Sequence, residues 1–242
     1  MEPVDAAQRV AAEHVPEAIA VLLGDSVLGA ARTATSDLDL VVVLDGPPAP
    51  FRETLRAHGW VVETFVHTRS SLEHYWGLDV QRRRPALLRM CAQSRVVASR
   101  AGEAEQIRTE AQERLAAGPP ELTADERDRL RYVLTDLLDD LEGCQDPGEL
   151  AHIAGGVLIT ASEMALAVAG RWRGTGKWLH RELVALDAGL AAELVTAHRT
   201  AVADGETAPL SGVAHRVLDQ AGGRLLEGYV APGEDPSRAS GT

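Results

Sequence analysis

The apolar residues of this chain change their spacing near residue 100. Before that point, short apolar runs rich in β-branched residues alternate with polar segments, which is the pattern of strands bounded by turns. After it, apolar residues recur every three or four positions, as in amphipathic helices. A chain of 242 residues can form one large domain or two small ones. The pattern predicts an α+β protein, in which an N-terminal mixed sheet is followed by a C-terminal helical bundle.

The first part of the chain is predicted to alternate strands with short helices. Four apolar runs are the expected strands, the last of them at an edge of the sheet: Ala18–Leu23, Leu38–Leu44, Trp60–Val66 and Arg95–Ala98. Two segments between them are expected to be helical: Arg52–His58 and Arg82–Gln93. We place the end of this domain at residue 102, so that it covers 1–102.

Helical periodicity continues over residues 103–231, which form the second predicted domain. A helix at Glu103–Ala117 ends at a Gly-Pro-Pro break, and Thr123 with Glu126 forms a capping box that begins the next helix. Further helices are expected at Gly148–Ala169, Lys177–Leu186, Ala188–Ala203 and Leu210–Gln220. Residues 232–242 are small and polar and are expected to form a disordered tail.

The charge balance narrows the classes of partner. Lys and Arg number 24 against 36 Asp and Glu, which gives a formal net charge of −12, and 45% of residues are hydrophobic. The hydrophobic content argues against disorder, and the acidic balance argues against a general nucleic-acid binder, which needs a basic face. An acidic surface would attract a cationic small-molecule substrate. Lys177 is the single lysine.

Cysteines and long apolar stretches give no sign of a secreted or membrane protein. Two cysteines form neither a disulfide framework nor a zinc cluster. The first ten residues lack the basic and apolar regions of a signal peptide. The most apolar stretch, Leu150–Gly170, contains His152 and Glu163, so it is expected to be a buried helix rather than a membrane span. These features favour a cytoplasmic protein.

The segment from Val21 to Leu44 carries the clearest chemical pattern. A strand is expected to end at Gly24, a tight turn carries Ser26, and Asp37 and Asp39 begin the next strand. Side chains two positions apart on a strand share a face, and two such carboxylates are costly unless they bind a cation. Hard oxygen ligands favour Mg²⁺, and backbone N–H groups in the turn suit a phosphate. The pattern predicts a Mg²⁺ site facing a phosphate group.

Ser26, ten intervening residues and then Asp37 and Asp39 resemble the signature of the DNA polymerase β-like nucleotidyltransferase superfamily. The chain is most similar to its small bacterial branch, which contains the kanamycin-type aminoglycoside nucleotidyltransferases and the minimal nucleotidyltransferases. The resemblance implies a nucleotidyltransferase domain that transfers a nucleoside monophosphate from an NTP to a hydroxyl acceptor and releases pyrophosphate. The acceptor would be a small molecule, for which an aminoglycoside is one candidate, and a homodimer is expected by analogy.

The resemblance also implies a set of metal ligands. Asp37 and Asp39 would bind Mg²⁺, and the family expects a third carboxylate on a neighbouring strand, for which Glu63 is the candidate. Glu63 is the only acidic residue of its apolar run, and an acid in such a strand needs a partner. It could instead lie on a solvated face or pair with an arginine such as Arg69.

Gly24, Ser26 and Ser36 are the expected nucleotide-binding residues of the turn. The family has glycine directly before the serine, whereas this chain has Asp25. Glycine permits close approach of the backbone to a triphosphate, and a carboxylate at the same place would repel it. Either the Asp25 side chain turns away, or nucleotide binding is weakened.

Candidates in the helical part are less specific. Lys177, after a glycine-rich turn, would reach the triphosphate or the pyrophosphate, or it is an ordinary surface lysine. Asp136 is the candidate general base or contact for the acceptor, although a solvated helix face is the commoner explanation for such an acid. Glu163 is a second candidate that must pair or be neutral if it is buried. The arginines at 82–84 are expected to begin a helix, where they neutralise phosphate or face solvent.

Three alternatives keep or replace this chemistry. Some minimal nucleotidyltransferases are antitoxins that adenylylate a partner protein, which would change only the acceptor. A nucleotidyltransferase-like domain could also bind its ligand without turnover, in line with Asp25. Arg173, six residues and His180 fit the loose motif of the HEPN ribonucleases, although an acidic chain is poorly suited to binding RNA.

Overall fold

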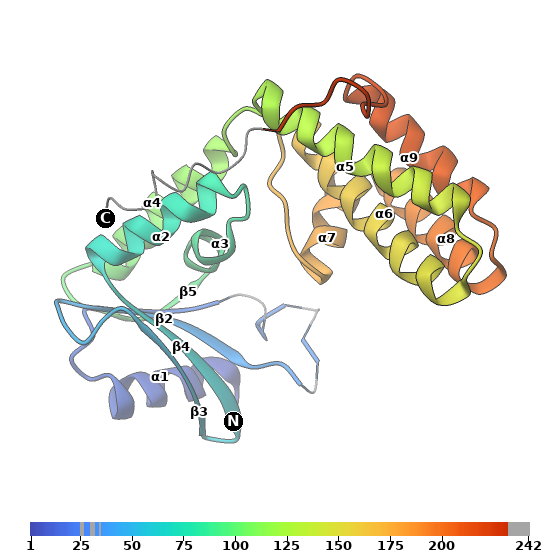
Figure 1. Cartoon of the computed structure of the whole chain (residues 1–242). Coiled ribbons are helices and arrows are strands. Elements are labelled where there is room, and N and C mark those ends of the chain that lie inside the picture. The colour runs from blue at the N-terminus through green and yellow to red at the C-terminus, as the bar shows by residue number, and fades with distance from the viewer. Residues whose placement is uncertain (25–26, 30–31, 34, 232–242) are drawn as a thin grey trace. The chain divides into compact units, whose positions relative to one another are not determined.

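The chain forms two compact units in a computed structural model that describes residues 1–24, 27–29, 32–33 and 35–231. The N-terminal unit comprises Met1–Pro120 and the C-terminal unit Glu121–Thr242. The first contains a sheet with helices on both faces, and the second is entirely helical in its described part (Figure 1). The protein is therefore α+β, as predicted.

The sheet of the N-terminal unit has five strands in the order β3-β4-β2-β1-β5. β2 pairs with β4 in parallel, and the other neighbours are antiparallel. The strands are β1 (Ala20–Leu23), β2 (Leu38–Leu44), β3 (Phe51–Ala57), β4 (Trp60–Thr68) and β5 (Arg95–Ser99). The expected strands at β1, β2, β4 and β5 are confirmed, and β5 lies at an edge of the sheet as predicted.

One face of the sheet is covered by α1 (Pro3–His14), which lies alone beneath it in Figure 1. Its small residues, such as Ala7 and Val10, pack against alternate residues of β2, including Leu40 and Val42. Because strand side chains alternate between faces, this packing assigns one set of β2 residues to the core and leaves the other set, which includes Asp39, on the opposite face.

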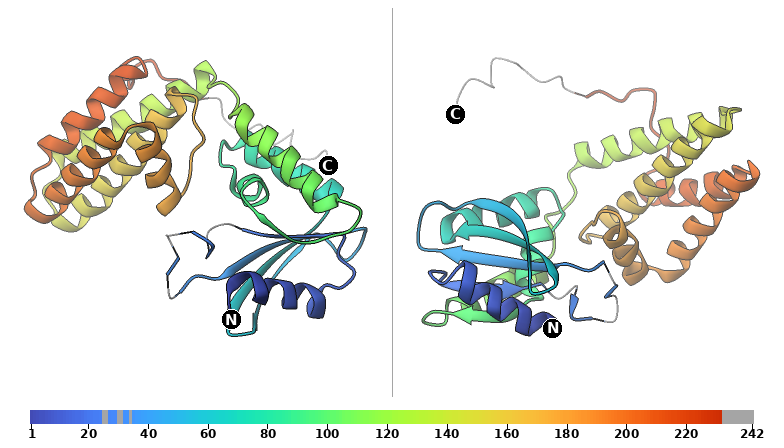
Figure 2. Two further views of the ribbon diagram at one scale, coloured as in Figure 1. Left: turned by 180° about the vertical axis from the view of Figure 1, so that it is seen from behind. Right: turned by 90° about the horizontal axis from the view of Figure 1, so that it is seen from below.

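The opposite face carries three helices, α2 (Arg69–Gln81), α3 (Ala86–Ala92) and α4 (Glu103–Ala117) (Figure 2). α4 has the predicted bounds and packs on α3 and β5 with a buried stripe that contains Ile107. This packing joins α4 to the sheet, so the boundary between the units lies after Pro120 rather than after residue 102 as expected from the change in periodicity.

The prediction of a helix at Arg52–His58 was wrong, because these residues belong to β3. The segment pairs antiparallel with β4 from Phe51 to Ala57, and most of its side chains are exposed. It is an edge strand, with β4 as its sheet neighbour. The arginine, glutamate and leucine of this segment favour a helix locally, but pairing with β4 supplies the backbone hydrogen bonds that determine its conformation.

The expected helix at Arg82–Gln93 is shorter in the structure and begins only at Ala86. Residues 82–84 connect α2 to α3, and Arg83 has a positive φ of 53° and is buried. Asp79 accepts a hydrogen bond from the N–H of Leu88 at 2.9 Å and so supports the first turn of α3. The prediction that the arginines at 82–84 begin a helix was therefore wrong.

The C-terminal unit is a bundle of five helices within its described part. They are α5 (Ala124–Gly143), α6 (Pro147–Val168), α7 (Lys177–Leu186), α8 (Ala188–Asp204) and α9 (Ala208–Gln220). The predicted capping box begins α5: the Thr123 side chain accepts from the Glu126 N–H, and the Glu126 side chain accepts from the Thr123 N–H. Leucines of α5, α8 and α9 and the alanines of α6 form one apolar core.

α6 is the one helix of the described chain that is long and apolar enough to cross a membrane, judged by length and composition alone. It lies within the bundle and contacts α5, α7, α8 and α9. Its buried residues, among them Val157, Ala161 and Met164, belong to the bundle core. This packing agrees with the expectation that the stretch is a buried helix.

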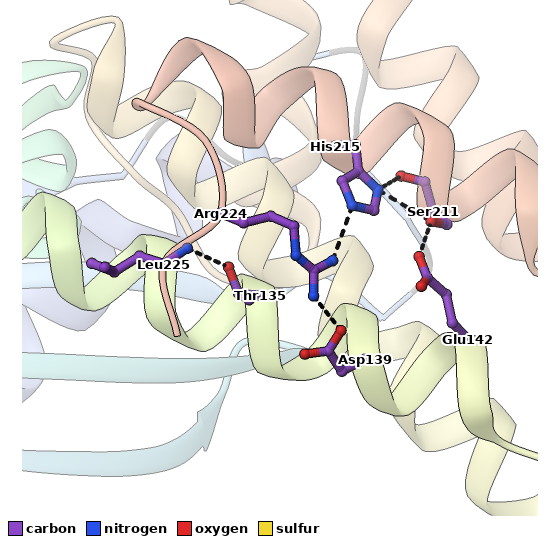
Figure 3. Close-up of polar contacts among 7 residues, drawn as sticks. All are labelled: Thr135, Asp139, Glu142, Ser211, His215, Arg224 and Leu225. Atoms are coloured by element: carbon purple, nitrogen blue, oxygen red, sulfur yellow. Dashed lines mark hydrogen bonds and ion pairs between the residues drawn. The ribbon is translucent and has the colours of Figure 1, made fainter. Parts of the chain in front are cut away.

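The chain after α9 turns back along α5. Arg131 donates hydrogen bonds to the carbonyl oxygens of Gly222 and Gly223 at 2.9 and 2.8 Å, and the N–H of Leu225 donates to Thr135 Oγ1 at 3.1 Å (Figure 3). We call residues 222–229 the return segment.

A polar network holds the return segment to α5 and α9 (Figure 3). Arg224 forms an ion pair with Asp139 and lies 3.1 Å from His215 Nε2. Because a guanidinium only donates, His215 accepts at Nε2 and donates from Nδ1 to the carbonyl of Ser211 at 2.9 Å. Ser211 in turn donates to Glu142 at 2.7 Å.

Candidate functional site

Three carboxylates come together on the face of the sheet that α1 does not cover. Asp37 lies directly before β2, Asp39 is its second residue, and Glu63 lies on β4. Asp39 and Glu63 are register partners across the parallel β2–β4 pair. One ligand oxygen from each side chain lies within 4.8 Å of the others, and all three residues are half-buried. We call this group the carboxylate cluster.

The cluster follows from the alternation of β2. Leu38 and Leu40 are fully buried in the core beneath α1, so Asp37 and Asp39 project from the other face. Parallel pairing then sets Glu63 directly beside Asp39. The sequence prediction that these three side chains converge is in agreement with this geometry.

Gly24 lies against the backbone of the cluster. Its N–H donates to the carbonyl oxygen of Asp39 at 2.8 Å, and a Cβ added at this glycine would lie 3.3 Å from the Cβ of Asp39. A side chain here would therefore press on Asp39. This contact gives Gly24 a role in positioning the cluster, whereas its expected contact with a nucleotide stays a prediction.

Glu63 also has a partner of opposite charge. Arg52 of β3 donates to Glu63 Oε2 at 2.5 Å, and its guanidinium lies 4.7 Å from the ring centroid of Phe65. The expected alternative that Glu63 pairs with an arginine is confirmed, but the partner is Arg52 and not Arg69, which binds Glu110 at 2.6 and 2.7 Å. Sequence analysis missed Arg52 because it assigned this residue to a helix, whereas the β3–β4 pairing brings it beside Glu63.

The donor set of the cluster fits a hard divalent cation. The candidate ligands are carboxylate oxygen atoms from side chains held on neighbouring strands, and Glu63 also accepts from Arg52. Mg²⁺ and Mn²⁺ prefer such oxygen ligands. Asp37, Asp39 and Glu63 could therefore hold a metal ion together, with Glu63 either leaving Arg52 or binding through its second oxygen.

A buried histidine lies further along the same face of β4. His67 is four residues after Glu63, and its ring packs edge-on against Tyr75 of α2 at 5.2 Å between centroids. Burial lowers the pKa of His67, which favours the neutral imidazole. His67 thus lies about 13 Å along β4 from Glu63, as a buried residue of the same sheet face.

The other predicted residues of the turn are only partly described. Ser26 and Asp25 lie outside the residues that the structure describes. Ser36 Oγ accepts a hydrogen bond from the N–H of Thr33 at 2.9 Å, so it closes the short loop that leads into Asp37. Its role in nucleotide binding stays a prediction.

The candidates of the C-terminal unit are placed within the bundle. Lys177 is the first residue of α7 and is exposed, and Asp136 is exposed on α5. Glu163 of α6 forms an ion pair with Arg173 at 3.4 Å, which meets the expectation that a partly buried carboxylate is paired. His180 is exposed on α7. The proposed roles of Lys177 and Asp136 in catalysis stay predictions.

The chain is similar in structure to solved proteins. No protein-family model matches the sequence, and no curated protein is similar to it in sequence. The solved structures include a nucleotidyltransferase-like protein from Exiguobacterium sibiricum 255-15, with a TM-score of 0.41 and 12% sequence identity. The match covers 90% of this chain and 73% of that one. At this TM-score the likeness assigns neither a family nor an activity to the chain.

Proposed function

We propose that this chain is a Mg²⁺-dependent nucleotidyltransferase that moves a nucleoside monophosphate from an NTP to the hydroxyl of a small-molecule acceptor. The observation that supports it is the carboxylate cluster, in which Asp37, Asp39 and Glu63 converge from two paired strands. Together with the resemblance of the segment around Asp37 to the nucleotidyltransferase signature, the cluster favours phosphoryl chemistry over the other functions considered.

In this proposal the three carboxylates hold the metal ion. When bound, the ion supplies positive charge that offsets the charge of the phosphates. Asp39 is held in place because its two neighbours in β2, Leu38 and Leu40, are buried in the core, and because the Gly24 N–H donates to its carbonyl oxygen. Asp37 directly precedes the buried Leu38. Rigid placement of the ligands lowers the cost of orienting the reacting groups.

The reaction is a displacement at phosphorus. The acceptor hydroxyl oxygen forms a bond to the α-phosphorus, the bond from that phosphorus to the oxygen bridging the β-phosphate breaks, and pyrophosphate leaves with the bonding electrons. The hydroxyl proton passes to a base, for which we propose Asp136, and Lys177 would stabilise the charge of the pyrophosphate. Ser26 and Ser36 would contact the nucleotide. The proposed location of the reaction is the cytoplasm.

The test is a double substitution of the ligands. Asp37→Asn together with Asp39→Asn keeps the side-chain shapes but removes two negative charges, so Mg²⁺-dependent pyrophosphate release is expected to be lost while the far-UV circular dichroism is unchanged. Asp45→Asn is the matched control, because Asp45 is exposed just after β2. Undiminished turnover in the double variant would overturn the proposal. Nucleotide binding by the wild type without pyrophosphate release would favour a binding domain instead.

A further inference from the structure

A second feature of the N-terminal unit is a pocket of about 870 Å³ beside the carboxylate cluster. One wall comes from the loop that leads into β2, and the other from the turn between β3 and β4. The residues that carry the argument are Arg32, Thr35, Ser36, Arg56, Trp60 and Val61. Ser36 is also one of the nucleotide-binding residues expected from the sequence.

The pocket begins next to the cluster. Ser36 directly precedes Asp37, and Val61 lies two residues before Glu63 on the same face of β4. Two residues along a strand span about 7 Å. Arg56 is the register partner of Val61, so it lies on the same face of the hairpin. A molecule in the pocket would therefore reach the cluster if it extended by the length of a few carbon atoms.

The charge of the pocket is opposite to that of the chain as a whole. Among its described lining residues are two arginines, Arg32 and Arg56, and one histidine, His58, but no carboxylate. Glu13 lies 2.9 Å from His58 Nε2, and its side chain is 53% exposed. Glu2 lies 3.6 Å from Arg32, but its side chain is 78% exposed, so its pairing is strongly weakened by water. Hydroxyl groups of the loop, including Ser36, add hydrogen-bond donors.

One wall of the pocket is held in place before any ligand binds. The guanidinium of Arg32 lies 5.0 Å from the ring centroid of Trp60. The indole N–H of Trp60 donates to the carbonyl oxygen of Met1 at 3.2 Å. An arginine held by stacking loses less conformational entropy when it binds an anion. The pocket is thus suited to a phosphate group, which arginine recognises through paired hydrogen bonds.

We infer that this pocket binds the acceptor, and that the acceptor is a hydroxyl-bearing phosphate ester of a sugar or polyol. The inference rests on the proposed function. The ester phosphate would bind Arg56, which lies on the face of the hairpin that carries Glu63, and the hydroxyl would point along β4 toward Glu63. That hydroxyl oxygen forms the new bond to the α-phosphorus of the NTP, pyrophosphate departs, and the ester phosphate of the acceptor is unchanged. A polycationic acceptor does not fit this pocket, because two arginines would repel it.

Binding to the pocket can be measured from the NMR signal of the Trp60 indole N–H. The chain has four tryptophans, and the indole N–H signal of Trp60 can be assigned by its absence in Trp60→Phe. We expect glycerol 3-phosphate, without metal or nucleotide, to shift this signal saturably, whereas glycerol leaves it in place. Arg56→Gln should weaken this binding about tenfold, because it removes charge-assisted hydrogen bonds. Arg95→Gln is the matched control, since it removes the same charge from the opposite edge strand β5.

The same titration separates acceptor from donor. α,β-Methylene-ATP with Mg²⁺ should bind Arg56→Gln as tightly as the wild type, and glycerol 3-phosphate should not displace it. The assignment is overturned if glycerol 3-phosphate causes no saturable shift at millimolar concentration, or if the aminoglycoside kanamycin causes it instead. It is also overturned if Arg56→Gln weakens binding of the nucleotide analogue equally, because the pocket would then hold the donor.

Failure of the inference can be told apart from failure of the proposed function. Phosphate binding at Trp60 is measured without turnover, so it should persist in Asp37→Asn with Asp39→Asn. A saturable shift in a wild-type chain that releases no pyrophosphate from any NTP would refute the proposed reaction and leave an anion site. Pyrophosphate release with a neutral or cationic acceptor would support the reaction and refute the phosphate-ester assignment.

Discussion

Replacing Arg52 by glutamine is expected to tighten the binding of divalent metal at the carboxylate cluster. Arg52 donates to the Glu63 carboxylate at 2.5 Å, and Glu63 is one of the three candidate ligands. The guanidinium and the metal ion therefore compete for the same group. Glutamine keeps most of the length of the side chain and removes its charge, so the competition is abolished while β3 retains a polar residue.

The size of the effect follows from how exposed the ion pair is. The Arg52 side chain is 57% exposed and that of Glu63 22%, so the pair resembles an exposed salt bridge, whose contribution is about 0.5–1 kcal/mol. Removing this competitor would lower the dissociation constant for metal about two- to fivefold. Repulsion between Arg52 and a bound dication adds to this figure, which makes it a lower bound.

Isothermal titration with Mn²⁺ or Mg²⁺ at physiological ionic strength measures the change. Under these conditions charges separated by more than about 8 Å are largely screened, so Arg95→Gln on the far edge strand should leave the affinity unchanged. If Arg52→Gln binds metal no more tightly than the wild type, Arg52 does not compete for Glu63. Weaker binding in Arg52→Gln would show that the ion pair instead orients Glu63 as a ligand.

Two further substitutions and a labelling experiment test the packing within each unit. Glu110→Gln should cost about 1–2 kcal/mol in urea unfolding. Burial raises the pKa of Glu110, but hydrogen bonding, chiefly from Arg69, outweighs it and lowers the pKa. The stabilisation is therefore present above the usual carboxyl pKa and is lost as the pH falls through the lowered one, a dependence that the variant should lack. Gly174→Ala places a Cβ 2.5 Å from the Trp178 carbonyl carbon and should lower the melting temperature, with a cost of about 2 kcal/mol or more; an unchanged melting temperature would contradict the packing. Burial raises the pKa of Cys91 to about 12, so a thiol reagent at mildly alkaline pH should label Cys91 only after unfolding. Slow labelling that persists in a Cys144→Ser variant would assign the protected thiol to Cys91.

Elements with clear end signals were predicted well from the sequence. α4 and α7 have the predicted bounds, Glu103–Ala117 and Lys177–Leu186. A Gly-Pro-Pro break follows the first, and a glycine-rich turn precedes the second. Such signals act within a few residues of the element they bound, so they can be recognised without knowledge of the fold.

Elements that depend on distant partners were missed. The apolar residues of β3 follow neither the helical period nor the strand period, and most of its side chains are exposed. Its pairing with β4 is what makes it a strand. α2 was not predicted because it buries only Leu72 and Trp76, too few for a helical stripe to be visible. In both cases the stabilising contacts come from residues distant in the sequence.

The same division applies to the candidate site. Asp37 and Asp39 could be identified because strand alternation alone puts them on one face. Glu63 could be identified because an acid in an apolar strand is unusual. Arg52 and the basic pocket could not, because both depend on the turn between β3 and β4 and on the register of that pair.

The return segment bears on how the chain folds while it is being synthesised. α5 is the first helix of the C-terminal unit, yet Tyr132 on it stacks on Tyr229, with ring centroids 4.3 Å apart. Thr135 of α5 accepts from the Leu225 N–H. One flank of α5 therefore stays uncovered until the return segment has left the ribosome. The N-terminal unit ends at Pro120 and can complete its sheet much earlier. A ribosome-bound chain arrested before residue 222 should thus carry a protease-resistant sheet unit and a protease-sensitive α5.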